Sequence, residues 1–190
     1  MNKSNKTIYL GLSADVLHHG HVNIINNASK YGKLIIGLMT DKAIIEKKKI
    51  PILTWHQRYN ILKNFNGVNK IIPQEQWDYS TNLLKVKPDF FIHGDDWKFK
   101  NSYDFELRKK VLQTLKKIKC KLIEIPHTKN ISSSIIFEKM KYLNKDLSSR
   151  TNMLKRIIET KKFCRIIEAH SPLSALITEN LIYREKNGQL

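Results

Sequence analysis

Short apolar runs alternate with amphipathic segments along the first 140 or so residues of this chain. The runs have strand length and are bounded by turn-forming or polar residues; they lie at 7–12, 34–39, 70–72, 89–93 and 121–125. Between them, apolar residues recur at helical spacing, most clearly at 22–29, 55–65, 103–118 and 135–143. Strands that alternate with helices in this way predict an α/β fold around a five-stranded parallel sheet with right-handed crossovers.

Local signals place several element boundaries. Thr54 has the position and chemistry of an N-cap for the helix that follows it. Pro73 is predicted to end the third strand, and Leu83–Val86 is predicted to form a short helix.

Polar clusters follow four of the five predicted strands. They are His18 to His21, Lys47 to Lys49, Gly94 to Trp97 and Ser132 to Ser134. Ligands of open parallel sheets bind beyond the carboxyl ends of the strands, and these clusters all fall there. The pattern therefore predicts a nucleotide or phosphate site at this edge.

The first cluster has the form HxGH, with His18 and His21 on either side of Gly20. Two imidazoles at a predicted helix start can reach the oxygens of a bound triphosphate. Glycine permits close approach of the backbone, and the helix N-terminus adds N–H donors and a positive dipole end. The alternative is a pair of surface histidines, but the preceding apolar strand favours the phosphate interpretation.

The remaining clusters suit the same ligand. One of the three lysines could neutralise charge as pyrophosphate leaves, and the serines could cap a helix or cradle an anion. Asp95 and Asp96 could bind a metal or a ribose, and Trp97 offers a stacking face. A phosphate or phosphonate oxygen is already anionic at pH 7, so an in-line attack on an α-phosphate requires positioning and electrostatic stabilisation rather than a general base.

The composition of the chain limits the class of protein and the compartment in which it works. The chain is 41% hydrophobic and 27% charged, with a net charge of +17 and two cysteines that form no CxxC or zinc spacing. The N-terminus has a basic start, but its short apolar run is not typical of a signal peptide, and no apolar run reaches membrane-spanning length, so we expect a cytoplasmic protein. The lysines are spread along the chain without an arginine-rich or aromatic-interleaved stripe, so nucleic-acid binding is a weaker alternative.

Taken together, four segments resemble the HxGH cytidylyltransferase family over about residues 7–143: GLSADVLHHGH, the basic stretch before ILTWHQR, FFIHGDDW and TKNISSS. The resemblance implies a Rossmann-like nucleotidyltransferase fold. Residues 152–182 resemble the start of phosphoenolpyruvate mutase, so the chain looks most like the N-terminal part of bifunctional cytidylyltransferase/phosphoenolpyruvate mutase proteins of phosphonate biosynthesis. We expect a cytidylyltransferase domain at 1–145, followed at 146–190 by a linker and an incomplete mutase-like segment with a helical tail. A complete mutase barrel takes about 250 residues, so we expect no mutase activity from these 190 residues.

The resemblance assigns roles to individual residues. Those expected to act directly in catalysis are His18, His21, Lys48 and Lys49. Those expected to bind the nucleotide are Gly11, Leu12, Ser13, Asp15, Gly20, Lys47, Arg58, Asp95, Asp96, Trp97, His127, Ile131, Ser132 and Ser133. The alignment leaves open which of the three consecutive lysines contacts phosphate, and no metal-ligating side chains are predicted.

Three positions depart from the glycerol-phosphate members of the family. His127 stands in place of an arginine, Asn130 in place of a glycine, and Ser80 where a basic residue would meet the acceptor. These departures affect the expected identity of the acceptor more than that of the nucleotide.

The resemblance implies transfer of CMP from CTP, with Mg2+, to a small phosphonate such as 2-hydroxyethylphosphonate or 2-aminoethylphosphonate, and a homodimer. Three alternatives remain open from the sequence: a glycerol-3-phosphate or other phosphomonoester acceptor, an adenylyltransferase of the same superfamily, and a basic nucleic-acid-binding protein that keeps the fold.

Overall fold

The computed structural model describes most of the chain, namely residues 5–98, 104–141, 154–155, 157–160 and 167–180. Five parallel strands form one sheet in the order β3-β2-β1-β4-β5. The strands are β1 (Thr7–Leu12), β2 (Lys33–Met39), β3 (Val68–Gln74), β4 (Phe90–Gly94) and β5 (Lys121–Ile125). This is the predicted α/β Rossmann-like architecture with a five-stranded parallel sheet.

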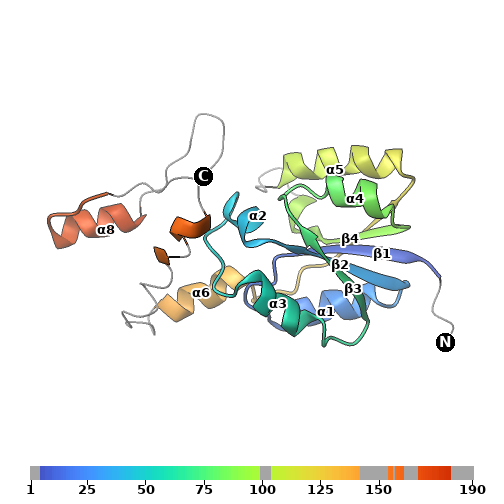
Figure 1. The fold of residues 1–190 in the computed structure, drawn as a ribbon, viewed down its shortest axis with the longest axis horizontal. Helices are drawn as coiled ribbons and strands as arrows, with labels where there is room; N and C mark the ends of the chain where they lie inside the picture. The colour runs from blue at the N-terminus through green and yellow to red at the C-terminus, as the bar shows by residue number, and fades with distance from the viewer. Residues whose placement is uncertain (1–4, 99–103, 142–153, 156, 161–166, 181–190) are drawn as a thin grey trace.

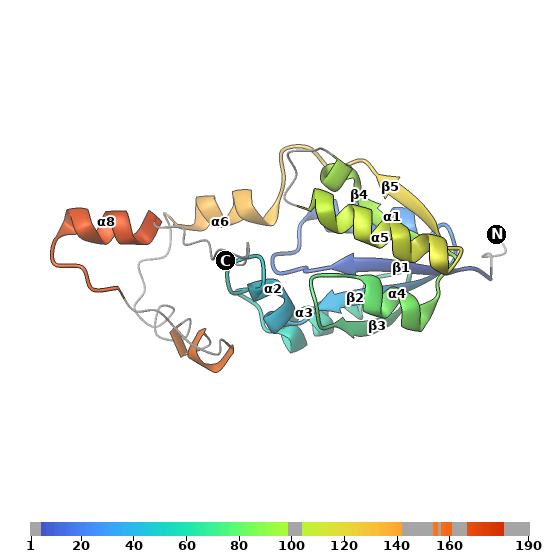
Figure 2. The same cartoon turned by 90° about the horizontal axis from the view of Figure 1, so that it is seen from above.

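Helices cover both faces of the sheet (Figure 1). They are α1 (His19–Ala28), α2 (Asp41–Ile45), α3 (Trp55–Leu62), α4 (Ser80–Val86), η1 (Asp95–Lys98, a 3-10 turn), α5 (Phe105–Lys117), α6 (Ser133–Lys141) and α8 (Pro172–Asn180). Helices α4 and α5 lie on one face, and α1 and α3 on the other (Figure 1). Because all five strands are parallel, their carboxyl ends lie at one edge of the sheet (Figure 2).

The core follows the period of the strands. Successive side chains of a strand point to opposite faces, and in β1 the side chain of Tyr9 joins the core under α4 and α5, whereas Ile8 and Leu10 join the core under α1 and α3. All three are fully buried. A central strand buried on both faces explains why the apolar runs of the sequence are continuous rather than alternating.

The five predicted strands are confirmed, but several boundaries differ, and the largest difference is in the third strand, which the sequence predicts over residues 70–72 and which spans Val68–Gln74. β3 continues through Pro73 to Gln74 and pairs with β2 over that stretch. It is an edge strand, where a residue without an N–H is tolerated because no further strand pairs with it. Thr54 caps α3 as expected, with its hydroxyl accepting from the N–H of Gln57. Helix α2 was not predicted.

The C-terminal part of the chain lies apart from the sheet. Helix α8 is well separated from it in both views (Figures 1 and 2). Its apolar side chains are exposed, with Leu173 at 67%, Leu176 at 56% and Ile177 at 57%. Among the described residues, no helix combines the length and apolar character needed to cross a membrane.

Arg58 is a fully buried cation that joins separate parts of the fold. Its guanidinium donates to the carbonyls of Ser13 (2.6 Å), Met39 (2.7 Å) and Leu53 (3.1 Å) and pairs with the Asp41 carboxylate at 2.5 Å. The sequence placed Arg58 at the nucleotide, and this is a correction. The side chain does not line the cavity described below, because its donors are used to fix the ends of β1 and β2.

Replacing Arg58 by alanine is expected to lower the free energy of unfolding by about 3–5 kcal/mol, since it removes a buried ion pair with Asp41 and the donor to three backbone carbonyls. Urea unfolding followed by circular dichroism measures the effect. Asn60→Ala, on the exposed side of the same helix, serves as the control and should cost less than about 0.5 kcal/mol. Equal stability of the Arg58→Ala and Asn60→Ala variants would contradict this role.

Candidate functional site

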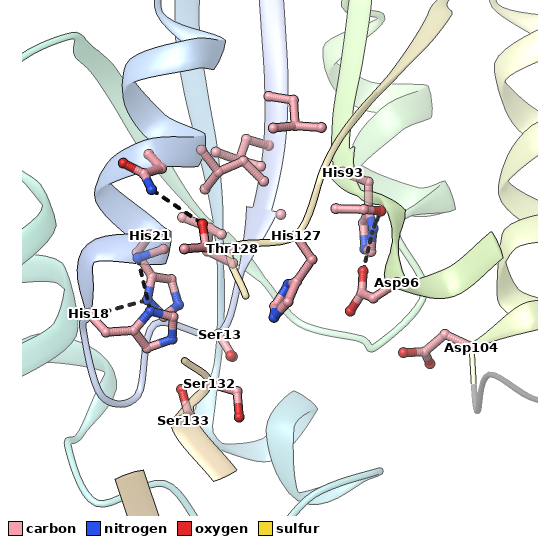
Figure 3. Close-up of a pocket in the computed structure, with 18 of the residues that line it drawn as sticks. Ser13, His18, His21, His93, Asp96, Asp104, His127, Thr128, Ser132 and Ser133 are labelled. Atoms are coloured by element: carbon pink, nitrogen blue, oxygen red, sulfur yellow. Dashed lines mark hydrogen bonds and ion pairs between the residues drawn. The ribbon is translucent and has the colours of Figure 1, made fainter. Parts of the chain in front are cut away.

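A cavity of about 650 Å³ opens at the carboxyl edge of the sheet. Its walls come from the ends of β1, β4 and β5, the start of α1, the segment after α2, and the start of α6 (Figure 3). Of the predicted site residues, those lining it are Gly11, Leu12, Ser13, His18, Gly20, His21, Lys48, Asp96, His127, Ser132 and Ser133. The sheet topology therefore brings together clusters that lie more than 100 residues apart in sequence.

His18 and His21 form a capping box at the start of α1. The N–H of Gly20 donates to Nδ1 of His18 at 3.2 Å, and the N–H of His18 donates to Nδ1 of His21 at 3.3 Å. These reciprocal bonds satisfy amides that a helix start otherwise leaves unpaired. The expectation of open N–H donors at this helix end is thus corrected in part, because the histidine rings take up two of them.

The same bonds determine which ring nitrogen carries the proton. A ring nitrogen that accepts from an N–H has no hydrogen of its own, so each neutral imidazole is protonated at Nε2. The two rings lie side by side with their centroids 4.1 Å apart (Figure 3). The arrangement provides two adjacent Nε2–H donors on the cavity wall.

Both imidazoles are neutral at pH 7. Burial, followed by electrostatic repulsion from His18, Lys48 and His127, lowers the pKa of His21 to about 4. Burial is also the main cause of a lowered pKa at His18, with His19 and His127 contributing. A bound polyphosphate would oppose these effects, because an anion stabilises the charged ring.

Gly20 makes room for this arrangement. A Cβ at this position would lie 2.9 Å from Cε1 and Nδ1 of His18 and 3.5 Å from Cβ of Thr128. The close neighbour of Gly20 is therefore the first histidine ring, which rests over the opening turn of the helix.

One of the three consecutive lysines lines the cavity. Lys48 follows α2, and its Nζ lies 5.1 Å from the ring centroid of Trp77, whereas Lys47 and Lys49 are not among the cavity residues. The structure thus places Lys48 alone of the three in the cavity wall, where the family resemblance left the choice open.

The start of α6 supplies hydroxyl groups. Ser132 accepts from the N–H of Ile135 at 3.2 Å and so caps the helix, and Ser133 donates to the carbonyl of Val16 at 3.5 Å. Both serines line the cavity near the histidine pair (Figure 3). The capping and anion-cradle interpretations of these serines are compatible.

Four further predicted residues lie outside the cavity wall: Asp15, Asp95, Trp97 and Ile131. Asp15 is buried and accepts from the N–H of Leu53 at 3.0 Å, and Asp95 accepts from the N–H of His127 at 2.8 Å. Trp97 is only 1% exposed, and its Nε1 donates to Glu124 at 2.7 Å. The expected stacking face of Trp97 is therefore wrong, because the ring is part of the core.

The face of Trp97 is covered by His93, a cavity residue that the sequence reasoning missed. The two rings stack with centroids 3.7 Å apart. Nδ1 of His93 donates to the carbonyl of Gly94 at 2.9 Å, and burial lowers the pKa of the ring. The sequence did offer one signal for His93, namely its place at the carboxyl end of the predicted fourth strand. Other missed cavity residues include Trp77, Tyr79, Asp104 and Thr128.

Asn130 stands where the glycerol-phosphate members of the family have a glycine, and its backbone adopts a conformation that glycine favours. Its φ is +62°, in the left-handed region that glycine adopts freely and asparagine tolerates better than most residues. Ser80 does not line the cavity; its hydroxyl bonds to Asp78 at 2.7 Å.

Comparisons with known proteins identify the family of this chain and agree with its fold. Residues 9–139 match the family described as Cytidylyltransferase-like. A glycerol-3-phosphate cytidylyltransferase from Bacillus spizizenii is 34% identical over 128 residues, which cover 66% of this chain and 90% of that protein. An ethanolamine-phosphate cytidylyltransferase from Arabidopsis thaliana is 28% identical over 95 residues, or 47% of this chain and 23% of that protein.

Among solved structures, a lipopolysaccharide core biosynthesis protein from Thermoplasma volcanium has the same fold, with a TM-score of 0.54 at 21% identity over 66% of this chain and 98% of that one. The family match and these relatives, together with the fold, show that the protein is a nucleotidyltransferase. More particularly, the chain belongs to the cytidylyltransferase-like family.

Titration of the histidines by NMR tests the electrostatics of the pair. In the unliganded protein we expect His21 to titrate near the low value of about 4. Saturating pyrophosphate should raise this pKa, so that His21 takes up a proton when pyrophosphate binds. Binding should therefore strengthen as the pH falls toward the pKa of His21 in the unliganded protein. An unliganded pKa at the ordinary histidine value, or no change with pyrophosphate, would contradict the described geometry.

Gly20→Ala is expected to displace the ring of His18 and to lower turnover by about tenfold or more while the protein stays folded. Circular dichroism and a pyrophosphate-release assay measure the two effects. Ala28→Gly, at the far end of the same helix, is the control; it should cost about 1 kcal/mol of stability without selective loss of turnover. Unchanged turnover in Gly20→Ala would exclude the steric role.

Proposed function

We propose that this protein transfers CMP from CTP to a small phosphonate and releases pyrophosphate. The observation that carries the proposal is the convergence of the His18–His21 pair, Lys48 and the α6 serines on one cavity. Neutral Nε2–H donors, an ammonium and hydroxyls are the groups that a triphosphate requires for binding and charge stabilisation.

The chemical step is an in-line displacement. An anionic phosphonate oxygen attacks the α-phosphorus of CTP, a new P–O bond forms, and the bond from the α-phosphorus to the bridging oxygen breaks. That oxygen leaves with its electron pair as part of pyrophosphate. No proton must be removed from the nucleophile, so the residues act by positioning and by stabilising charge.

Each group of the cavity has a part in this step. The Nε2–H atoms of His18 and His21 donate to phosphate oxygens and hold them against the start of α1. Lys48 offsets the charge that develops on the leaving pyrophosphate. Ser132, whose hydroxyl oxygen accepts from the N–H of Ile135, donates its hydroxyl hydrogen from the start of α6.

Mg2+ is expected to enter with CTP, bound to its phosphate oxygens and reducing their charge. Within the described part of the chain, no three His, Cys, Asp or Glu side chains cluster where they could hold a metal ion. The nucleotide is therefore the better source of ligands for Mg2+.

Two features favour a phosphonate over a phosphomonoester. His127 lines the cavity where the resemblance led us to expect an arginine, so the surroundings of the acceptor differ from those of the glycerol-phosphate enzymes. The second feature is the resemblance of residues 152–182 to a mutase that forms carbon–phosphorus bonds.

The direct test is pyrophosphate release from CTP and Mg2+ with 2-hydroxyethylphosphonate, 2-aminoethylphosphonate, phosphoethanolamine and glycerol 3-phosphate. We expect CTP-dependent turnover that is faster with the phosphonates, and little turnover with ATP. Turnover confined to phosphomonoesters would overturn the proposed acceptor, and turnover confined to ATP would overturn the nucleotide.

A pair of His18 variants separates helix capping from chemistry. Asparagine is a good N-cap, so His18→Asn should keep the stability of the protein, whereas His18→Ala should lose about 1 kcal/mol. Both should lower turnover by about 100-fold or more because neither has an Nε2–H donor. Thermal unfolding and pyrophosphate release measure the two quantities. Near-normal turnover in His18→Asn would remove the histidine from the mechanism.

The neighbouring lysines offer a matched comparison. Lys48→Ala should lower turnover by about tenfold or more, since it removes the cavity ammonium, whereas Lys49→Ala removes the same charge away from the cavity and should have little effect. Steady-state kinetics with CTP measure both variants. A larger loss in Lys49→Ala than in Lys48→Ala would contradict the placement.

A further inference from the structure

The side-chain amide of Gln74 is buried at the end of β3 and is fully hydrogen-bonded. The residue is 1% exposed. Its Oε1 accepts from the hydroxyl of Tyr9 at 2.5 Å and from Nδ2 of Asn82 at 2.9 Å. Its Nε2 donates to the carbonyls of Gln76 at 2.8 Å and Asp78 at 2.9 Å. A primary amide offers two hydrogens and two lone pairs, so this group is held in one orientation and fixes two carbonyls of the next segment.

The groups that donate to this amide are themselves fixed by the sheet and by α4. The hydroxyl of Tyr9 lies over β2 at Gly37, where a Cβ would be 1.8 Å from the hydroxyl oxygen. Burial raises the pKa of Tyr9, so the hydroxyl keeps the proton that it donates. Asn82 also donates to this hydroxyl at 3.0 Å and to the carbonyl of Pro73 at 2.9 Å. The amide of Gln74 therefore rests on a buried network that joins β1, β3 and α4.

The backbone of Gln74 holds a second part of the cavity wall. Its carbonyl accepts from the N–H of Thr40 at 2.9 Å, and Thr40 is the N-cap of α2. Lys48 follows α2, and its N–H donates to the carbonyl of Ile44 within that helix at 2.8 Å. One residue thus contacts both the segment that carries Trp77 and the start of the helix that leads to Lys48.

The two segments meet in the cavity wall. Trp77 lies between the two carbonyls that the amide holds, and its N–H donates to the carboxylate of Glu46, the residue that follows α2, at 3.1 Å. The Nζ of Lys48 lies 5.1 Å from the centroid of the indole ring, within the range of a cation–π interaction. A lysine side chain is a point charge on a flexible stem. Its position in the cavity therefore depends on where the indole is held.

We propose that Gln74 is a positioning residue for the transfer: by fixing the segment that carries Trp77, it sets the place of the Lys48 ammonium in the cavity. The inference rests on the role proposed for Lys48. Gln74 itself lies outside the cavity wall, so it acts through Trp77. A displaced ammonium stabilises the leaving pyrophosphate less well, and the effect falls on the chemical step.

Gln74→Glu is the informative variant. Its carboxyl keeps an oxygen for Tyr9 and Asn82, but it has at most one hydrogen and cannot donate to both carbonyls. We expect kcat to fall by about fivefold while the KM for CTP changes by less than about twofold. The loss should not exceed that of Lys48→Ala, because it acts through the same ammonium. An unchanged kcat would overturn the inference.

Gln76→Glu is the matched control. It makes the same chemical change two residues further along at an exposed side chain, and it keeps an acceptor for the hydroxyl of Thr81. Because it leaves the amide of Gln74 in place, kcat and the KM for CTP should both stay at the values of the unmodified protein. A loss of kcat equal to that of Gln74→Glu would show that added charge, and not the amide, is responsible.

A double-mutant cycle separates positioning from support of the fold. In the Lys48→Ala background, Gln74→Glu should change kcat by less than about twofold, because the ammonium that it positions is gone. Losses that multiply in the double variant would mean that Gln74 only supports the fold. Full turnover in Lys48→Ala would instead remove the role proposed for the lysine, and the inference with it. The cycle uses the acceptor with the fastest turnover, so its result is independent of the phosphonate proposal.

Tyr9→Phe repeats the test if Gln74→Glu does not fold. It removes one donor to the amide and keeps the buried ring, so kcat should fall by about threefold, and again not in the Lys48→Ala background. A fall that persists in that background would contradict positioning. If no acceptor is turned over, the indole N–H signal of Trp77, assigned by NMR with Trp77→Phe, should move in Tyr9→Phe and not in Gln76→Glu. An unmoved signal in Tyr9→Phe would refute the link.

Discussion

Two hydrogen bonds from backbone amides to imidazole rings determine the chemistry of the cavity. The N–H groups of Gly20 and His18 donate to Nδ1 of His18 and His21, which fixes both the position and the tautomer of each ring. A helix start that must satisfy its own amides thereby becomes a pair of Nε2–H donors. The arrangement depends on the missing side chain of Gly20 and on α1, which is anchored under the sheet by Ile25.

Buried charges hold the loops that surround this pair. Leu53, at the end of the segment that carries Lys48, accepts from Arg58 through its carbonyl and donates to Asp15 through its N–H. The family resemblance implied a nucleotide-binding role for both charged residues, and both bond here to the backbone. They connect the loop after β1 to the lysine segment, and a ligand between these two loops therefore meets a wall that is already ordered.

The sequence predicted the five strands, the polar clusters that follow four of them and the edge of the sheet at which the site lies. Apolar runs and turn residues are local signals, so they can be read directly from the sequence. It did not distinguish residues that line the cavity from residues that support it. Trp97 and Arg58 belong to the supporting group, since their polar atoms are used within the core. His93 and Asp104 reach the cavity through stacking and through a long-range hydrogen bond, which no spacing in the sequence reveals. The continuation of β3 past Pro73 depended on its place at the sheet edge.

The charge distribution of the cavity links these observations to function. Donors for phosphate are gathered at the start of α1, and the carboxylate of Asp104 stands apart from them. The measurement that tests the central claim most directly is the 15N NMR spectrum of the imidazoles of His18 and His21 in the free and CTP-bound protein. The account predicts protonated Nε2 and unprotonated Nδ1 in the free protein, with a shift of the Nε2–H signals when CTP binds. Rings protonated at Nδ1, or Nε2–H signals that do not respond to CTP, would contradict it.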